Sequence, residues 1–501
     1  MEHTNVPGFP ETRSGERSHP VTGPATRRFG ICQSAMRILL ISANTAKSPY
    51  PVYPLGLSMI AASLVNAGHV VSQFDFLQQD TSLKAVAFAM REFQPDLVGI
   101  SLRNIDNTNI LNEQKYIPCV RDIVNTVRAE SGCRVVLGGS GFSIMPEVIL
   151  DAVGADYGIV GEGERLIVAF VEAAARGEYP QDRCLRAAPS LRGLEIPAAR
   201  YDTDIMSFYR KNGNLAGVQT KRGCTHKCIY CSYPILEGAG IRPRDPAAVV
   251  EDVRHLVEKH AAAYIFFTDS VFNDDEGHFR KVVHRMYSEG IKVPWTAFFR
   301  PGGLDDEIVA LMKKTGLHAA EIGSDAASDT ALRKLGKNYR FKEIVTCNDL
   351  FARHGIASAH YFMFGCPGET PELVLEGIRN IKSLRGAAIF IFMGIRILPG
   401  TALAEVARRN GMLSQDDRDL LDPVYYISPE LDRTWLENTL TKAFADQKHC
   451  VFPPNAMDDS LRFLHKMGHV GPLWDLLLQE RMRIPQKRSI PKRNSGSCAP
   501  D

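Results

Sequence analysis

Short apolar runs alternate with amphipathic stretches between Met36 and about residue 176. The apolar runs have the length of buried strands and comprise Arg37–Ser42, Val70–Asp75, Leu97–Leu102, Val135–Gly138 and Tyr157–Val160. The stretches with helical periodicity comprise Leu55–Ala67, Leu83–Phe93, Ile117–Glu130, Pro146–Ala152 and Glu164–Arg176. This alternation predicts βαβ units in a Rossmann-like α/β domain with a doubly wound parallel sheet. Such sheets bind ligands beyond the carboxyl ends of their strands.

A second alternation begins after residues 177–213, which we interpret as a linker. Its predicted strands are Gly217–Lys221, Tyr264–Thr268, Trp295–Phe299, Ala319–Gly323, Ser358–Phe364 and Ala388–Ile397, and helices fill the gaps between them. Six βα repeats in this order predict a partial (β/α)6 barrel over residues 214–410, with its chemistry at the carboxyl ends of the strands.

The remaining segments have a different character. Residues 1–35 are rich in Pro, Gly, Ser, Thr and Arg without periodicity, which predicts a disordered extension before a first domain at 36–176. Residues 411–484 lose the alternation and contain scattered aromatic residues, so we expect a mostly helical C-terminal domain. A polar stretch at 485–501 is predicted to be a flexible tail.

Composition narrows the class of protein. The chain has 501 residues and a formal net charge of +2, without a long basic stretch interleaved with aromatics, so nucleic acid is not the expected partner. Eleven scattered cysteines in a chain of this size do not suggest a secreted disulfide framework. No apolar run is long enough to span a bilayer, and the N-terminus lacks the pattern of a signal peptide. These features predict a soluble, cytoplasmic protein.

Three cysteines stand close together after the first predicted barrel strand, in the run Lys221 to Cys231. Cys224, Cys228 and Cys231 have the spacing Cys-x3-Cys-x2-Cys, and three thiolates can hold three irons of a cubane cluster. The fourth iron then lacks a protein ligand and is open to chelating chemistry. A zinc site that also used His226 is the alternative, although His226 lies between the cysteines on a very short loop.

This motif, with Tyr230 before the third cysteine, resembles the radical S-adenosylmethionine (SAM) superfamily over about residues 214–405. The resemblance implies a [4Fe–4S] cluster on the three cysteines and SAM bound to the open iron. It also implies reduction by a one-electron donor such as flavodoxin or ferredoxin, and cleavage of SAM to a 5′-deoxyadenosyl radical. Tyr230 is then a candidate SAM contact.

Later segments are similar to further motifs of that superfamily. Phe266–Asn273 resembles its second-strand segment, which makes Thr268 and Asp269 candidate SAM contacts. Glu321–Asp329 resembles the fourth-strand pattern Gly-x-Glu-Ser-Gly-Ser, with Asp325 in place of the glutamate, which makes Asp325 a candidate contact to the SAM ribose. Phe364–Thr370 is similar to the turn after the fifth strand. Gly394–Thr401 resembles the end of the sixth strand, which makes Arg396 another candidate.

Glycine-rich strand ends in the first domain suggest a second cofactor, because glycine permits close approach of the backbone to a large flat ligand. These strand ends resemble the cobalamin-binding domain that precedes the barrel in the B12-dependent branch of the superfamily. The candidate cobalamin contacts are Ser101, Arg103, Asn104, Gly138, Gly139, Gly161 and Glu162. The Asp-x-His-x-x-Gly motif that supplies a histidine to cobalt is missing, since the first loop reads Asn44 to Pro49. A domain that kept the fold and lost the cofactor is the alternative.

Cobalamin beside a radical site suggests methylation of an unactivated carbon in a natural-product or lipid intermediate. Members of the same architecture that catalyse cyclisation or rearrangement without net methyl transfer are the main alternative. A non-enzymatic cobalamin or redox sensor and a zinc-binding interaction protein are the others. The sequence assigns no catalytic side chain.

Overall fold

The computed structural model describes residues 35–186, 190–414, 417 and 419–478. The predicted tail at 485–501 lies outside these residues, and so does the predicted N-terminal extension up to residue 34.

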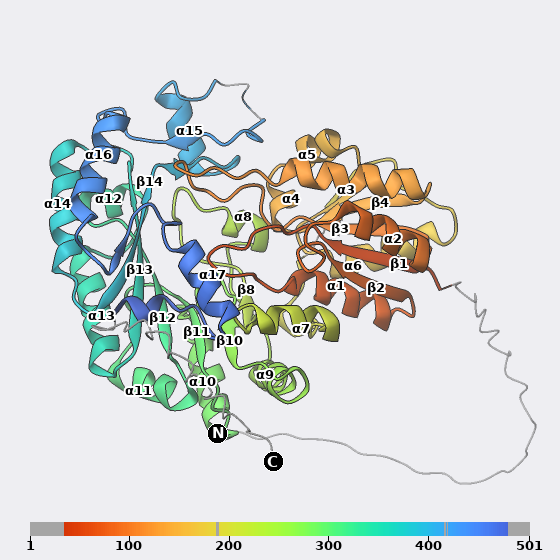
Figure 1. The fold of residues 1–501 in the computed structure, drawn as a ribbon, viewed down its shortest axis with the longest axis horizontal. Coiled ribbons are helices and arrows are strands. Elements are labelled where there is room, and N and C mark those ends of the chain that lie inside the picture. The colour runs from red at the N-terminus through yellow and green to blue at the C-terminus, as the bar shows by residue number, and fades with distance from the viewer. Residues whose placement is uncertain (1–34, 187–189, 415–416, 418, 479–501) are drawn as a thin grey trace, which may run out of the picture. The chain divides into compact units, whose positions relative to one another are not determined.

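The first domain is a six-stranded, wholly parallel sheet with the strand order β2-β1-β3-β4-β5-β6. Its strands are β1 (Arg37–Ser42), β2 (Val70–Asp75), β3 (Leu97–Ser101), β4 (Arg134–Gly138), β5 (Tyr157–Val160) and β6 (Cys184–Arg186). The helices between them are α1 (Leu55–Asn66), α2 (Leu83–Phe93), α3 (Ile117–Glu130), α4 (Ser140–Ile144), α5 (Pro146–Val153) and α6 (Glu164–Ala174). The doubly wound α/β prediction is confirmed (Figure 1).

Alternation along the strands explains why both faces of this sheet carry helices. Ile38 and Leu40 of β1 pack in one core with α1 and α6, whereas Leu39 and Ile41 pack in another with α2, α3 and α5. Parallel strands that are apolar on both faces require this double cover. The chain leaves β1 on one side toward β2 and leaves β3 on the other toward β4, which places a ligand-binding crevice at the carboxyl ends of β1 and β3.

The segment interpreted as a linker contains regular structure. It supplies β6 to the edge of the first sheet, a short 3-10 helix η1 (Gly193–Glu195) and helix α7 (Thr203–Lys211). Asp202 caps α7 by accepting hydrogen bonds from the backbone of Asp204 and Ile205.

The second sheet has the order β17-β14-β13-β12-β11-β10-β7, with parallel pairing throughout. Its strands are β7 (Leu215–Val218), β10 (Tyr264–Phe267), β11 (Trp295–Phe299), β12 (Ala319–Asp325), β13 (Ala357–Phe364), β14 (Ala387–Met393) and β17 (Cys450–Val451). The helices α9 (Pro246–His260), α10 (His278–Ser288), α11 (Asp306–Thr315), α12 (Asp329–Lys334), α13 (Phe341–Arg353) and α14 (Pro371–Ser383) connect the strands (Figure 1). Six of the strands form the predicted partial barrel.

The C-terminal region contains helices α15 (Ala402–Arg409), α16 (Arg433–Phe444) and α17 (Asp458–Lys466), and a 3-10 helix η2 (Trp474–Leu478). It also contains two short strands that sequence patterning did not indicate. β16 (Tyr425–Tyr426) pairs with β15 (Ile395–Arg396), and β17 extends the barrel sheet beyond β14. Trp474 packs on alanines of the barrel strands, so this region is joined to the barrel through both pairing and packing.

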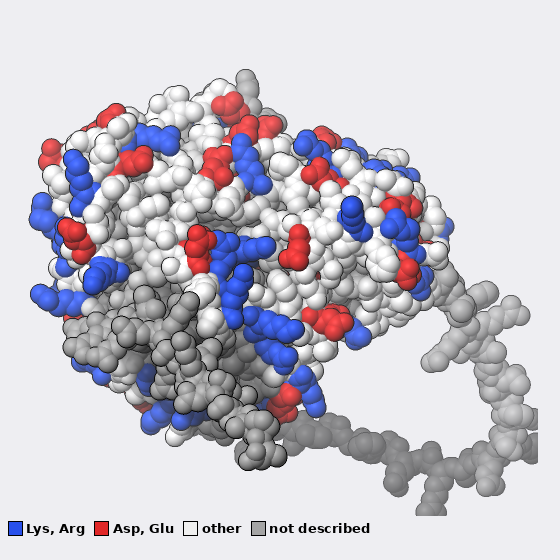
Figure 2. Space-filling model, viewed as in Figure 1, with Lys and Arg blue, Asp and Glu red and all other residues white. Residues whose placement is uncertain are grey.

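Within the described residues, no helix is long and apolar enough to cross a membrane. On the face shown in Figure 2, acidic and basic side chains are mixed, in keeping with the small net charge.

Candidate functional site

The three cysteines lie on a loop between β8 (Lys221–Arg222) and helix α8 (Tyr233–Glu237). The Cys224 amide donates to Gly238 O at 3.1 Å, and the Cys231 amide donates to Cys228 O at 3.2 Å. Cys224 is buried, and the other two are partly buried. Burial raises the pKa of Cys231 to about 12, so this thiol stays protonated until metal binding releases its proton.

The number of thiols on this loop suits a cluster better than a single ion. Among the described residues, no three His, Cys, Asp or Glu side chains converge as the ligands of one metal ion would. Zinc requires four ligands at about 2.0–2.3 Å from one centre, whereas each thiolate on a cubane binds a different iron. Three thiolates on this loop therefore suit three irons of a cubane, whereas a zinc ion would need a fourth ligand.

Two of the candidate SAM contacts meet beside the cysteine loop. Tyr230 Oη donates to Asp325 Oδ1 at 2.6 Å, and Tyr339 Oη donates to Asp325 Oδ2 at 3.2 Å. The sequence gave no reason to single out Lys337, whose Nζ lies 2.5 Å from Asp325 Oδ2 and 3.0 Å from Cys228 Sγ. Asp325 has a φ of 63°, a left-handed conformation that is uncommon outside glycine and is frequent at functional sites.

The Asp269 carboxylate is hydrogen-bonded to other residues of the chain. It is buried and accepts hydrogen bonds from Thr220 N at 2.7 Å, from Thr220 Oγ1 at 2.5 Å and from Lys221 Nζ at 2.9 Å. These contacts anchor the strand that leads into the cysteine loop. They favour a role in positioning that loop over a direct contact with SAM, because the carboxylate is already saturated with donors.

The Arg396 guanidinium is also hydrogen-bonded to other residues of the chain. Its Nε donates to Asp106 Oδ2 at 2.8 Å, and its two terminal nitrogens donate to the carbonyls of Ile397 and Leu420. The buried guanidinium thus joins the end of the barrel to the loop after β3. An arginine with this many partners has little capacity left for SAM.

A cavity of about 580 Å³ opens at the carboxyl ends of the first sheet. All the candidate cobalamin contacts line it, namely Ser101, Arg103, Asn104, Gly138, Gly139, Gly161 and Glu162. Residues of the barrel domain line the same cavity, and Phe266, Thr268 and Phe298 from the strand ends are among them. Gly139 has a φ of 99°, and a Cβ there would lie 2.5 Å from Leu102 O, so only glycine fits.

Ion pairs join this cavity to the cysteine loop. Glu162 receives hydrogen bonds from Arg242 at 2.8 Å and from Leu191 N at 2.7 Å. Glu164 receives one at 2.5 Å from Arg222, two residues before Cys224. These carboxylates at the start of α6 therefore fix the cysteine loop against the first domain.

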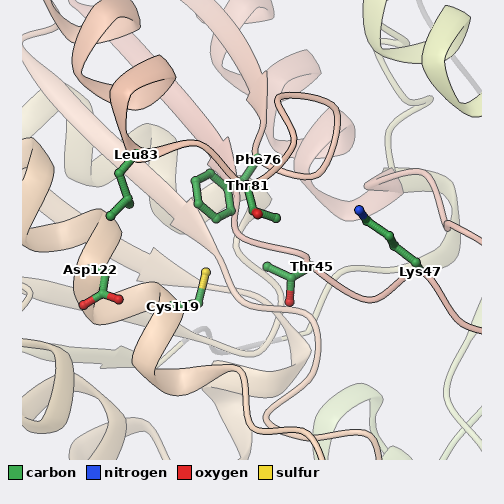
Figure 3. A pocket seen from close by; sticks show the side chains of 7 residues that line it. All are labelled: Thr45, Lys47, Phe76, Thr81, Leu83, Cys119 and Asp122. Carbon is green, nitrogen blue, oxygen red and sulfur yellow. The ribbon is translucent and has the colours of Figure 1, made fainter.

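A separate pocket of about 390 Å³ lies near the carboxyl ends of β1 and β2 (Figure 3). Its lining consists of Thr45, Lys47, Phe76, Thr81, Leu83, Cys119 and Asp122. Burial raises the pKa of Cys119 to about 11, so this thiol stays protonated and unreactive at neutral pH. None of the candidate cofactor contacts lines this pocket.

Residues 41–171 match the family of B12 binding domains, and residues 218–381 match the radical SAM superfamily. The chain therefore carries a B12-binding domain followed by a radical SAM domain. An uncharacterized methyltransferase of Pyrococcus horikoshii is 27% identical over 398 residues, which is 75% of this chain and 84% of that protein. Tryptophan 2-C-methyltransferase of Streptomyces laurentii is 24% identical over 445 residues, or 74% of each chain.

The solved structure of the radical SAM methyltransferase TsrM from Kitasatospora setae has the same fold. It superposes with a TM-score of 0.79 at 21% identity and covers 89% of this chain and 97% of that one. The cofactors of this B12-dependent radical SAM family are a [4Fe–4S] cluster, SAM and cobalamin. In this chain, the cysteine loop is the part that fits the cluster, and the glycine-lined cavity is the part that fits the corrin.

A buried carboxylate on β12 was not singled out from the sequence, although an acidic residue within an apolar strand is a usable signal. Glu321 accepts a hydrogen bond from Tyr361 Oη at 2.9 Å, and its Oε1 has no partner among the described residues. Burial raises the pKa of Glu321 to about 7. The folded protein therefore holds a proton that the unfolded chain releases above about pH 4.3.

We expect Glu321→Gln to remove a pH-dependent cost to stability. Because the pKa is raised by folding, wild-type stability falls as the pH rises from about 4.3 to 7, by on the order of 3 kcal/mol. The variant should gain melting temperature relative to wild type between pH 5 and pH 8 in scanning calorimetry. Glu307→Gln, at an exposed position on α11, is the control and should show no such trend. A difference between Glu321→Gln and wild type that is the same at both pH values would contradict the expectation.

Proposed function

We propose that this chain cleaves SAM reductively to a 5′-deoxyadenosyl radical and methylates an unactivated carbon of a natural-product or lipid intermediate. The observation that carries this proposal is the shared cavity, because Phe266, Thr268 and Phe298 of the barrel face the same space as the glycines of the first sheet. When bound, the cluster supplies the electron for cleavage and cobalamin carries the methyl group. The electron comes from a donor such as flavodoxin or ferredoxin in a reducing cytoplasm, and no nucleic acid takes part.

The chain's own residues hold and orient the reactants. Cys224, Cys228 and Cys231 hold the cluster, and Thr268 at the end of β10 is the best placed of the SAM candidates. Asp269 and Arg396 position the surrounding loops through their buried hydrogen bonds. Phe266 and Phe298 form an edge-to-face pair with centroids 5.2 Å apart, and this apolar wall suits a planar acceptor and limits water near the radical.

The test is anaerobic incubation of the reconstituted protein with SAM carrying a labelled methyl group and a strong reductant. L-tryptophan is the first acceptor to try, because a relative is a tryptophan methyltransferase. Formation of 5′-deoxyadenosine together with S-adenosylhomocysteine and labelled product supports methyl transfer. 5′-Deoxyadenosine without S-adenosylhomocysteine favours cyclisation or rearrangement. Neither product, with all cofactors bound, would favour a sensor.

We also expect the bound cobalamin to have no protein histidine on cobalt. No histidine is among the residues that line the cavity in the described part of the chain, and the loop after β1 lacks one. Electron paramagnetic resonance of the Co(II) form should therefore show no nitrogen hyperfine change when the protein is labelled with nitrogen-15. Splitting that changes with the label would contradict this.

A further inference from the structure

A lysine from the loop after α12 reaches the cysteine loop. Lys337 Nζ lies 3.0 Å from Cys228 Sγ, 3.1 Å from Tyr230 Oη and 2.5 Å from Asp325 Oδ2. We propose that Lys337 tunes the cluster: its ammonium donates a hydrogen bond to the Cys228 thiolate and raises the reduction potential. This inference rests on the proposed function only in requiring a [4Fe–4S] cluster on the three cysteines.

The backbone fixes the lysine in this place. The Ile229 amide donates to Leu335 O at 3.1 Å, which ties the end of α12 to the cysteine loop. Gly336 has a φ of 77°, and a Cβ there would lie 2.5 Å from Lys227 O. Only glycine at 336 therefore allows the backbone to approach the cysteine loop this closely. This approach places the side chain of the next residue, Lys337, beside Cys228.

The ammonium has as many neighbouring acceptors as protons. Its three N–H groups face Asp325, Tyr230 Oη and Cys228 Sγ, and its side chain is only 9% exposed. Its Nζ also lies 5.2 Å from the centroid of the Tyr230 ring. No N–H remains for a further ligand, so Lys337 acts on the cluster and not as a free anion site.

Asp325 is the counter-ion that holds the ammonium. It accepts from Tyr230 and Lys337, and its Oδ2 lies 3.2 Å from the Tyr339 hydroxyl; these contacts favour a positioning role over a contact with the SAM ribose. With the cluster bound, one buried cation thus stands between two anions, the Asp325 carboxylate and the Cys228 thiolate.

The direction of the effect follows from charge. Reduction adds one electron to the cluster, and a positive charge with a hydrogen bond at a ligand sulfur stabilises the more negative state. In a poorly hydrated site this stabilisation is stronger than in water. Lys337 should therefore make the cluster easier to reduce, and reduction is the step that precedes cleavage of SAM.

The experiment is a potentiometric titration of the reconstituted cluster, followed by electron paramagnetic resonance without SAM, so that a lost SAM contact cannot cause a shift. Lys337→Met keeps the length and removes the charge, whereas Lys337→Arg keeps the charge. Lys334→Met removes one charge from an exposed position on α12 and is the matched control. We expect Lys337→Met to lower the ratio of reduced to oxidised cluster at least about tenfold at a fixed solution potential, which is about 59 mV.

The arginine variant should recover most of this shift, and Lys334→Met should match wild type. A reduction potential that is unchanged in Lys337→Met would overturn this inference and leave the proposed function standing. Loss of the cluster in both the methionine and the arginine variants would also overturn it, because the residue would then serve assembly. A wild-type protein that takes up no 4Fe cluster would overturn the proposed function, and this inference with it.

Discussion

Replacing Cys224, Cys228 or Cys231 by alanine should abolish the 4Fe cluster and reduce SAM cleavage to the level of a sample without protein. Each thiolate binds a different iron, and the loop offers no fourth cysteine as a substitute. Iron and sulfide analysis after anaerobic reconstitution, with chromatography of 5′-deoxyadenosine, measures both effects.

Cys119→Ala is the matched control for these variants. Cys119 lies on α3 of the first domain, is partly buried and has no companion cysteine in that pocket. Its removal should leave iron, sulfide and SAM cleavage at the wild-type level. A Cys228→Ala protein that retained full iron, sulfide and cleavage would overturn the cluster assignment.

The strands of both sheets could be predicted because most of them are buried on both faces and therefore read as apolar runs. β17 could not be predicted, since Cys450 and Val451 are only two residues and are a strand only through pairing with Ile389 and Phe390. β6 has only three residues and pairs at the sheet edge. Such elements depend on tertiary pairing, and local patterning contains no signal for them.

The residues of the candidate site also fall into two groups: those that local sequence indicates and those that only tertiary contacts bring together. The cysteine loop is a local motif, so its spacing alone indicates the chemistry. Lys337 and Cys228 are 109 residues apart, and their contact depends on how α12 packs. Arg396 and Asp106 are 290 residues apart, and only the folded chain reveals that this arginine already has a partner.

Filling the glycine-lined cavity should prevent cobalamin binding while sparing the cluster. Gly138 ends β4 and lines the cavity, and a Cβ there would lie 3.9 Å from Ile159 O, an ordinary contact. Gly138→Phe therefore places a ring in the cavity without forcing the backbone. We expect cobalamin affinity to fall at least about tenfold, or about 1.4 kcal/mol, as measured by retention of hydroxocobalamin through gel filtration.

The matched control is Gly132→Phe, because Gly132 is exposed just before β4 and a Cβ there meets nothing within 4 Å. It adds the same ring to the same domain outside the cavity, so cobalamin retention should stay at the wild-type level. Iron content should be unchanged in both variants, since the cysteine loop is held by Arg222 and Glu164 and does not contact Gly138. Equal cobalamin retention in Gly138→Phe and wild type would place the corrin elsewhere. Loss of cobalamin retention in both variants would mean that the added ring damages the domain wherever it is placed. The smaller substitution Gly138→Val would then show whether filling the cavity itself lowers cobalamin retention.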